Sequence, residues 1–113
     1  MIYSYVVRSQ IDDARVFETY VSWLRDTHVG EMCVSGARDA DLLVMDVAPN
    51  EPFAVEVHYR FVSRDAYEKY EREHAPRMQQ AGLAELSRLG VEPGRGVSFQ
   101  RATGKALAWQ KRN

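Results

Sequence analysis

Residues 53–62 alternate strictly between two kinds of side chain, and this alternation constrains the fold more than any other feature of the sequence. One face of the extended segment carries Phe53, Val55, Val57, Tyr59 and Phe61, and the other carries Ala54, Glu56, His58, Arg60 and Val62. Such a period of two is typical of a β-strand with one face against a core. The apolar segment 41–47 and the proline-containing turn 48–52 precede it, which predicts a hairpin of two antiparallel strands.

Helical and strand patterns elsewhere extend this hairpin into a larger fold. The predicted elements are, in order, a strand at 2–7, a helix at about 13–27, strands at 41–47 and 53–62, a helix at 63–89 and a strand at 97–101. Pro76 has no backbone N–H to donate, so the second helix is expected to kink or restart there. The stretch 29–36 lies between the helix and the hairpin and contains two glycines, so it is expected to be irregular.

The order β-α-β-β-α-β defines the fold class as α+β. It is the split βαβ arrangement of ferredoxin-like domains, in which a four-stranded antiparallel sheet carries two helices on one face. With 113 residues the chain is expected to form a single domain, 1–113, in which 102–113 is a peripheral tail. Hydrophobic residues are expected on both faces of several strands, so the second face needs a partner. A homodimer that closes two sheets into a dimeric α/β barrel is the simplest partner.

Composition excludes several classes of function. Fifteen Lys and Arg residues against sixteen Asp and Glu give a net charge of −1, so no nucleic-acid partner is expected. No apolar run approaches the roughly 18 residues that span a bilayer, so no membrane partner is expected either. The N-terminal residues do not resemble a signal peptide, and the one cysteine, Cys33, cannot form an internal disulfide, which favours a cytoplasmic location.

Histidines and tyrosines are the candidate site residues. His28 continues the apolar stripe of the first helix and His74 that of the second, so both imidazoles are expected to point toward the sheet. A cleft at that place would bind a ligand through tyrosines of the first strand and the second helix, namely Tyr3, Tyr5, Tyr67 and Tyr70. The expected ligand is a small apolar or weakly acidic molecule.

Catalytic roles can be assigned to three of these side chains if the protein is an enzyme. His74 is then the general base or acid, His28 orients the substrate and Arg77 holds an anionic group. The alternative is structural: each histidine caps a helix end or bonds a backbone carbonyl, and Arg77 pairs with Glu73 one turn away. The sequence leaves both interpretations open.

Cofactor and metal motifs give no further assignment. The sequence has no Gly-rich phosphate loop, cysteine pair, His-Glu-x-x-His or Gly-x-Ser-x-Gly motif. His28 and Glu31 have a ligand-like spacing, but a metal site generally needs three or four ligands. We therefore expect no metal site and no cofactor.

Two motifs resemble a small family of uncharacterised bacterial proteins in the dimeric α/β-barrel superfamily. They are WLRDTHVGEM at 23–32 and HAPRMQQAGL at 74–83, of which the second is the more specific. The resemblance covers about residues 2–86 and implies a ferredoxin-like protomer that forms a barrel dimer. Gly30 stands where the family has proline, and 90–113 has no clear counterpart. The family brings no established activity with it.

Three functions fit these observations. The first is a homodimeric protein that binds a small molecule in a cleft between helices and sheet. The second is a cofactor-independent monooxygenase, or an isomerase or cyclase, acting on small aromatic or polyketide-like compounds, a class that the wider superfamily includes. The third is a non-catalytic dimeric interaction module. A binding or catalytic role predicts both histidines in one cavity, whereas an interaction module predicts histidines bonded to backbone carbonyls.

Overall fold

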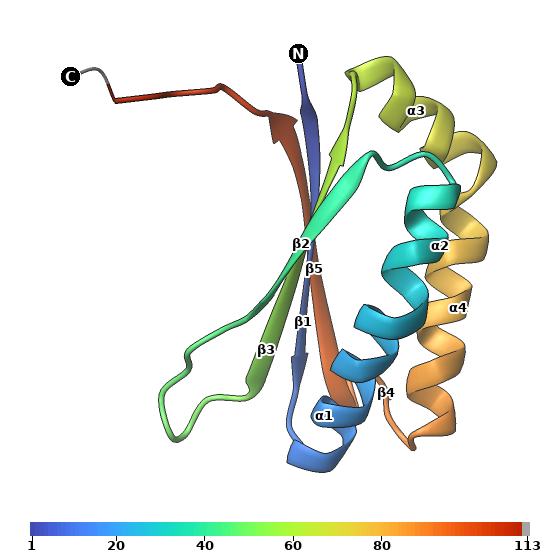
Figure 1. Ribbon diagram of the computed structural model, residues 1–113. Coiled ribbons are helices and arrows are strands. Elements are labelled where there is room, and N and C mark those ends of the chain that lie inside the picture. Colours follow the sequence, from blue (N-terminus) through green and yellow to red (C-terminus); the bar gives the residue numbers. More distant parts are fainter. Residues whose placement is uncertain (112–113) are drawn as a thin grey trace.

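A twisted sheet carries all of the helices on one face, as a computed structural model that describes residues 1–111 shows (Figure 1). Its strands are β1 (Tyr3–Ile11), β2 (Asp39–Val44), β3 (Phe53–Phe61), β4 (Glu92–Pro93) and β5 (Gly96–Lys105). They lie in the order β2-β3-β1-β5-β4, and the four long strands, β2, β3, β1 and β5, pair antiparallel with one another. This is the predicted ferredoxin-like arrangement with one strand more than predicted.

The extra strand β4 is a consequence of the turn that leads into β5. Glu92 and Pro93 pair in parallel with Gly96 and Val97, which requires the two residues between them to loop the chain back to the start of β4. Gly94 and Gly96 have φ values of 81° and 94°, a backbone region that glycine enters without strain. A Cβ on Gly96 would also lie 2.7 Å from a methyl carbon of Val91. Glycine at both positions therefore makes this tight turn possible, and with it the short strand β4.

The first helical segment is longer than predicted. It consists of α1 (Ala14–Trp23), a π-helical turn η1 (Leu24–His28) and α2 (Val29–Val34). The prediction that 29–36 is irregular was therefore wrong for 29–34. Gly30 costs about 1 kcal/mol in a helix interior, but Met32 in the same turn is only 2% exposed. Burial of a methionine side chain contributes about 1.5–3 kcal/mol, so packing outweighs the low helix propensity of glycine.

The second helical segment breaks where Pro76 predicted it would. Helix α3 (Arg64–Glu73) begins at Ser63, whose hydroxyl accepts a hydrogen bond from the Ala66 backbone N–H at 3.1 Å. Helix α4 (Ala75–Arg88) begins directly after His74, whose φ of −130° interrupts the helical geometry. Pro76 lies in the first turn of α4. A backbone N–H there would have no intrahelical acceptor, so proline costs the helix no hydrogen bond.

The core lies between the helices and one face of the sheet. Ile11, Val55 and Phe61 are fully buried there, and an aromatic cluster surrounds Phe61, whose ring lies 5.3 Å from that of Tyr67 and 5.4 Å from that of Tyr70. This arrangement confirms that the apolar face of the alternating segment 53–61 points inward.

The opposite face of the sheet is mostly polar, contrary to the expectation of hydrophobic residues on both faces. Arg8 on β1 pairs with Glu56 on β3 at 2.7 Å, and His58 lies 2.9 Å from the same carboxylate. Arg60 pairs with Asp39 and Asp41 on β2. The expectation was wrong because the sequence alone does not show that the charged residues of neighbouring strands lie side by side on one face. We refer to this surface as the open face.

The last strand is also longer than predicted. Its register pairs Val97 with Ile11 and Lys105 with Tyr3, so 102–105 belong to the sheet and not to the predicted peripheral tail. From Ala106 the chain leaves the sheet on the side away from the helices (Figure 1), with Leu107 and Trp109 78% and 83% exposed. Within the described residues, no helix has the length and apolarity needed to cross a membrane.

Candidate functional site

A cavity of about 50 Å³ lies between the helices and the sheet. Its walls come from β1, β3 and β5 on one side and from α1, the π-turn, α2, α3 and α4 on the other. The lining residues are Tyr5, Val7, Ser9, Tyr20, Leu24, His28, Met32, Val57, Tyr59, Tyr70, Met78, Gln79, Gly82, Leu83, Phe99 and Arg101. Most of this wall is apolar or aromatic, and its polar groups are the tyrosine hydroxyls and the side chains of Ser9, His28, Gln79 and Arg101. An apolar wall with polar groups placed in it is usual for a small-molecule site.

His28 is the buried histidine of this cavity. It is 8% exposed, its ring stacks on Trp23 with centroids 4.6 Å apart, and its Nδ1 has no hydrogen-bond partner among the described residues. Burial lowers the pKa of His28, and the nearby carboxylate of Glu31 only partly opposes this. A neutral imidazole has one nitrogen that donates and one that accepts, so His28 can exchange a proton with a bound molecule.

The π-turn determines where His28 lies. The backbone N–H of Val29 donates to the carbonyl oxygen of Leu24, a wider spacing than the four residues of an α-helix. Leu24 and His28 are both buried at the cavity, one at each end of this turn. Single π-turns within helices are frequent at functional sites, because they change which side chains share a face.

Four tyrosines add hydroxyl groups to the cavity. Burial raises the pKa of Tyr5, Tyr20, Tyr59 and Tyr70, so all four stay protonated at neutral pH. The positive charge of Arg101 opposes this rise for Tyr5, Tyr20 and Tyr70. The Tyr70 hydroxyl donates to Met32 Sδ at 3.2 Å. The cavity is therefore rich in neutral hydrogen-bond donors beside one guanidinium.

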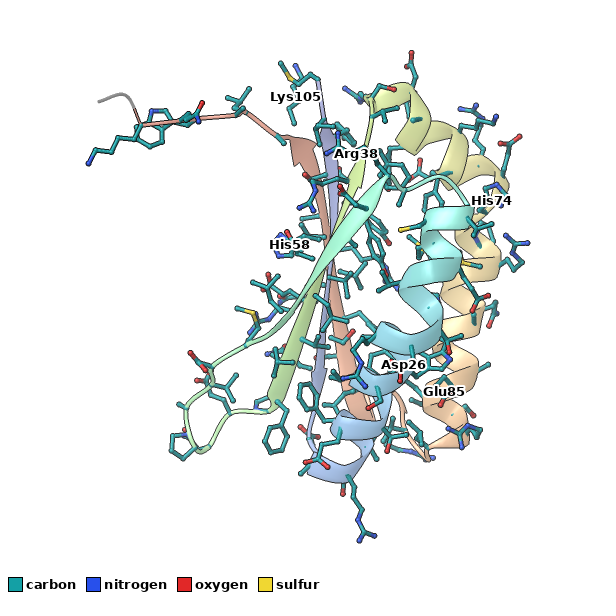
Figure 2. All side chains as sticks on the ribbon, in the orientation of Figure 1. Asp26, Arg38, His58, His74, Glu85 and Lys105 are labelled. Atoms are coloured by element: carbon teal, nitrogen blue, oxygen red, sulfur yellow. The ribbon has the colours of Figure 1, made fainter. Side chains whose placement is uncertain are left out.

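The structure brings three of the seven predicted site residues together at the cavity, namely His28, Tyr5 and Tyr70. His74 lies at the junction of α3 and α4 (Figure 2) and lines a different hollow, with Ser35, Gly36 and Lys69. Its Nδ1 is 3.0 Å from Arg77 Nη2, which also donates to Ser35 Oγ at 3.3 Å. His28 and His74 thus do not share one cavity, because the helix break turns His74 away from it. The proposed catalytic roles of His74 and Arg77 stay predictions.

Tyr3 and Tyr67 lie near the end of the sheet, where Tyr67 belongs to the aromatic cluster around Phe61. Their ring centroids are 5.4 Å apart, and the guanidinium of Arg64 lies 5.9 Å from the Tyr3 ring. The Tyr67 hydroxyl donates to Glu71 Oε2 at 3.1 Å. Neither residue lines the cavity. A ligand-binding role for them stays a prediction.

Sequence reasoning missed Arg101 and Gln79, the most polar side chains of the cavity wall besides His28. Arg101 was assigned to the last strand, but its face could not be assigned without the register of that strand. The signal was present in the alternation of Val97, Phe99 and Arg101, of which the first two pack against the core. Within residues 1–111, no group of three or more His, Cys, Asp or Glu side chains is arranged to hold a metal.

The lowered pKa of His28 predicts a pH-dependent stability. An unfolded histidine binds a proton near its ordinary pKa of about 6.5, whereas burial delays protonation of the folded one to lower pH. Below about pH 6.5 the unfolded state therefore binds more protons, and the free energy of unfolding falls as the pH falls. We expect a loss of up to about 1.4 kcal/mol per pH unit until the folded imidazole is also protonated.

Urea unfolding at several pH values between about 7.5 and 5.5 measures this slope. His28→Gln should flatten the slope, and His74→Gln should leave the contribution of His28 in place. If both variants kept the slope of the parent protein, burial of His28 would not be its cause.

Comparison with known proteins places the chain in a family. A family model described as a domain of unknown function, DUF4286, matches residues 2–88. This confirms the resemblance to an uncharacterised family with a ferredoxin-like fold. No curated protein matches the chain in sequence.

Solved structures share the fold at low sequence identity. A dimeric ferredoxin-like protein from an uncultured marine organism has a TM-score of 0.69 and 13% identity, covering 96% of this chain and 98% of its own. A dimeric protein of unknown function from Bacteroides fragilis has a TM-score of 0.62 and 11% identity, covering 93% and 96%.

A third similar structure contains a ligand. It is a monooxygenase from the gene ActVA-Orf6 of Streptomyces coelicolor in complex with Nanaomycin D, with a TM-score of 0.63 and 19% identity, covering 98% of this chain and 92% of its own. At such identities these structures support the ferredoxin-like fold alone. The family assignment rests instead on the match over 2–88, more than half of the sequence, and by that match the chain belongs to the DUF4286 family.

Proposed function

We propose that the protein is a homodimeric small-molecule-binding domain whose ligand occupies the cavity beside His28. The observation that carries this proposal is the Nδ1 of His28, a buried polar atom without a partner among the described residues, in a side chain that lines the cavity. An unsatisfied buried polar group costs about 1–3 kcal/mol, and a ligand group that bonds it removes that cost. An interaction module would instead have His28 bonded to a backbone carbonyl, so this atom favours ligand binding.

The size of the cavity limits what it can hold. An engineered cavity of about 150 Å³ accommodates benzene, whereas this one measures about 50 Å³. A short aliphatic molecule fits with little rearrangement, and a ring requires side chains such as Met78 or Leu83 to move. Methionine is flexible, so its side chain can make that adjustment at low cost.

Methionine methyl groups provide a direct test of ligand binding. Met32 and Met78 line the cavity, whereas Met1 and Met45, the other two methionines of the chain, do not. We expect titration with propionate or propionamide to shift the NMR signals of the Met32 and Met78 methyl groups and to leave those of Met1 and Met45 unchanged. Shifts at all four signals, or at none, would contradict binding in this cavity.

A blocking variant and a matched control complete this test. A Cβ on Gly82 would meet only the Tyr20 hydroxyl, at 3.9 Å, so Gly82→Leu places a larger side chain in the cavity without a backbone clash. Ala84→Leu is the matched control, because it introduces the same side chain on the exposed side of α4. We expect Gly82→Leu to weaken probe binding at least tenfold and Ala84→Leu to leave it unchanged, because only the first competes for the same space.

A cofactor-independent monooxygenase or isomerase is the second candidate function. The neutral imidazole of His28 beside protonated tyrosines supports it, since such a site can take a proton from an acidic carbon and stabilise the resulting enolate. The similar monooxygenase solved with Nanaomycin D supports it as well. For this reaction we assign the proton transfer to His28, because it lines the cavity and His74 does not.

The assembly that we propose for this protein is a homodimer. Two of the similar structures are described as dimeric, and the open face has no helix over it. The ion pairs of Arg8 with Glu56 and of Arg60 with Asp39 and Asp41 hold the charged side chains of this face within the protomer. A second copy can therefore pack on the open face without leaving those charges unpaired. We also propose a cytoplasmic location, which the single cysteine supports.

A further inference from the structure

We infer that Arg101 makes the cavity selective for a small apolar carboxylate. This inference rests on the proposed ligand-binding function and names the chemical class of its ligand. It starts from the charges of the cavity wall: among its sixteen lining residues, Arg101 is the one with a permanent charge, and none is acidic.

The charge of Arg101 has no counterion in the described part of the chain. The salt bridges of residues 1–111 involve other arginines or His58, and none includes Arg101. Its guanidinium carbon lies 5.2 Å from the centroid of the Phe99 ring, so the aromatic ring covers one side of it. Stacking on a ring leaves the N–H groups at the edge of the guanidinium available for an acceptor.

The other polar groups of the wall also favour an acceptor. Tyr5 stays protonated and can donate, and the amide of Gln79 has two N–H groups. Arg101 and Gln79 both lie near the Tyr5 hydroxyl, since each lowers the otherwise raised pKa of Tyr5. A carboxylate matches this arrangement, since its two oxygens accept two parallel hydrogen bonds from a guanidinium and leave lone pairs for a third donor.

The apolar part of the cavity wall and the cavity volume determine the apolar part of the ligand. Leu24, Met32, Val57 and Met78 offer apolar surface, and the cavity measures about 50 Å³. A group that fits this space without rearrangement has the size of about three or four water molecules. The ligand that satisfies charge, donors and volume together is a carboxylate on a short apolar chain.

Pairs of probes that differ in charge but not in shape test the inference. Propionate and propionamide form the first pair, and benzoate and benzamide form a larger one. We expect propionate to bind at least about tenfold more tightly than propionamide, measured by the shifts of the Met32 and Met78 methyl signals, because a hydrogen bond to a charged group is stronger than one to a neutral group. Added salt should reduce this ratio, since Arg101 is exposed on one side.

Arg101→Gln keeps a hydrogen-bonding side chain and removes the charge, so we expect the ratio to fall to about one. Lys105→Gln is the matched control, because Lys105 lies on the same face of β5 but at the end of the sheet (Figure 2), outside the cavity wall. It should keep the ratio of the parent protein. Urea unfolding of both variants establishes that each is folded.

The outcomes separate this inference from the proposed function. If the amides bind in the cavity as tightly as the carboxylates, or if Arg101→Gln keeps the ratio, the charge selectivity is wrong and ligand binding in the cavity stands. If no probe shifts the Met32 and Met78 signals, the cavity function and the selectivity both fail. A carboxylate preference that only Arg101→Gln abolishes supports the inference.

Discussion

Phe61→Ala is expected to lower the free energy of unfolding by about 3–5 kcal/mol, which is the usual cost of truncating a buried phenylalanine. Phe61 is fully buried at the end of β3, and its ring packs on Tyr67 and Tyr70 of helix α3. Alanine would leave a void between the sheet and α3 that the surrounding aromatic rings cannot close. Urea unfolding followed by far-UV circular dichroism measures the loss.

Phe53→Ala is the matched control for this substitution. Phe53 is the first residue of the same strand and lies on the same face, but it is 38% exposed, and its ring contacts Phe17 at 5.5 Å. We expect it to cost about 1–2 kcal/mol, since less apolar surface is lost from the core. Equal losses for the two variants would show that burial at Phe61 does not dominate the stability of the sheet.

Val6→Lys is expected to convert the proposed homodimer to a monomer. Val6 lies in the middle of the open face, with His58 of β3 on one side and Ala102 of β5 on the other. A lysine there faces solvent in a single protomer, but in a dimer packed through the open face it would be buried together with its symmetry copy. Two like charges held close together without water cost several kcal/mol, enough to dissociate the dimer at micromolar concentration.

Size-exclusion chromatography with light scattering distinguishes the two masses. Val34→Lys is the matched control, since Val34 is 90% exposed at the end of α2, in the helical layer and away from the open face. We expect the parent protein and this control to have the mass of two chains and Val6→Lys to have the mass of one. A dimeric Val6→Lys variant, or a monomeric parent protein, would overturn the proposed interface.

The fold could be predicted from the sequence because its strongest patterns are local. The alternation at 53–62 identifies the buried face of β3, and Ser63 and Pro76 mark where α3 begins and where it gives way to α4. The continuation of the first helix through Gly30 could not be predicted in this way. It depends on the burial of Met32 against the rest of the core, which a propensity argument does not include.

The candidate site was harder to predict because it depends on contacts between distant segments. His28 and His74 both continue helical stripes, so the sequence treats them alike. The two histidines differ in the local helix geometry. The π-turn before α2 places His28 at the cavity, and the helix break before α4 places His74 beside Arg77. The alternation of Val97, Phe99 and Arg101 places the three on one face of β5, but only the register of β5 against β1 shows that Arg101 reaches the cavity.

The pairing of β1 with β5 has a consequence for how the chain folds. Strand β1 is central, but one of its two neighbours is formed by residues near the other end of the sequence, where Lys105 pairs with Tyr3. Closing so long a loop is entropically costly, and contacts between distant residues slow folding. During synthesis, one edge of β1 therefore stays unpaired until β5 has left the ribosome. An unpaired strand edge is a template for pairing with other chains, so the growing chain is open to aggregation in that interval.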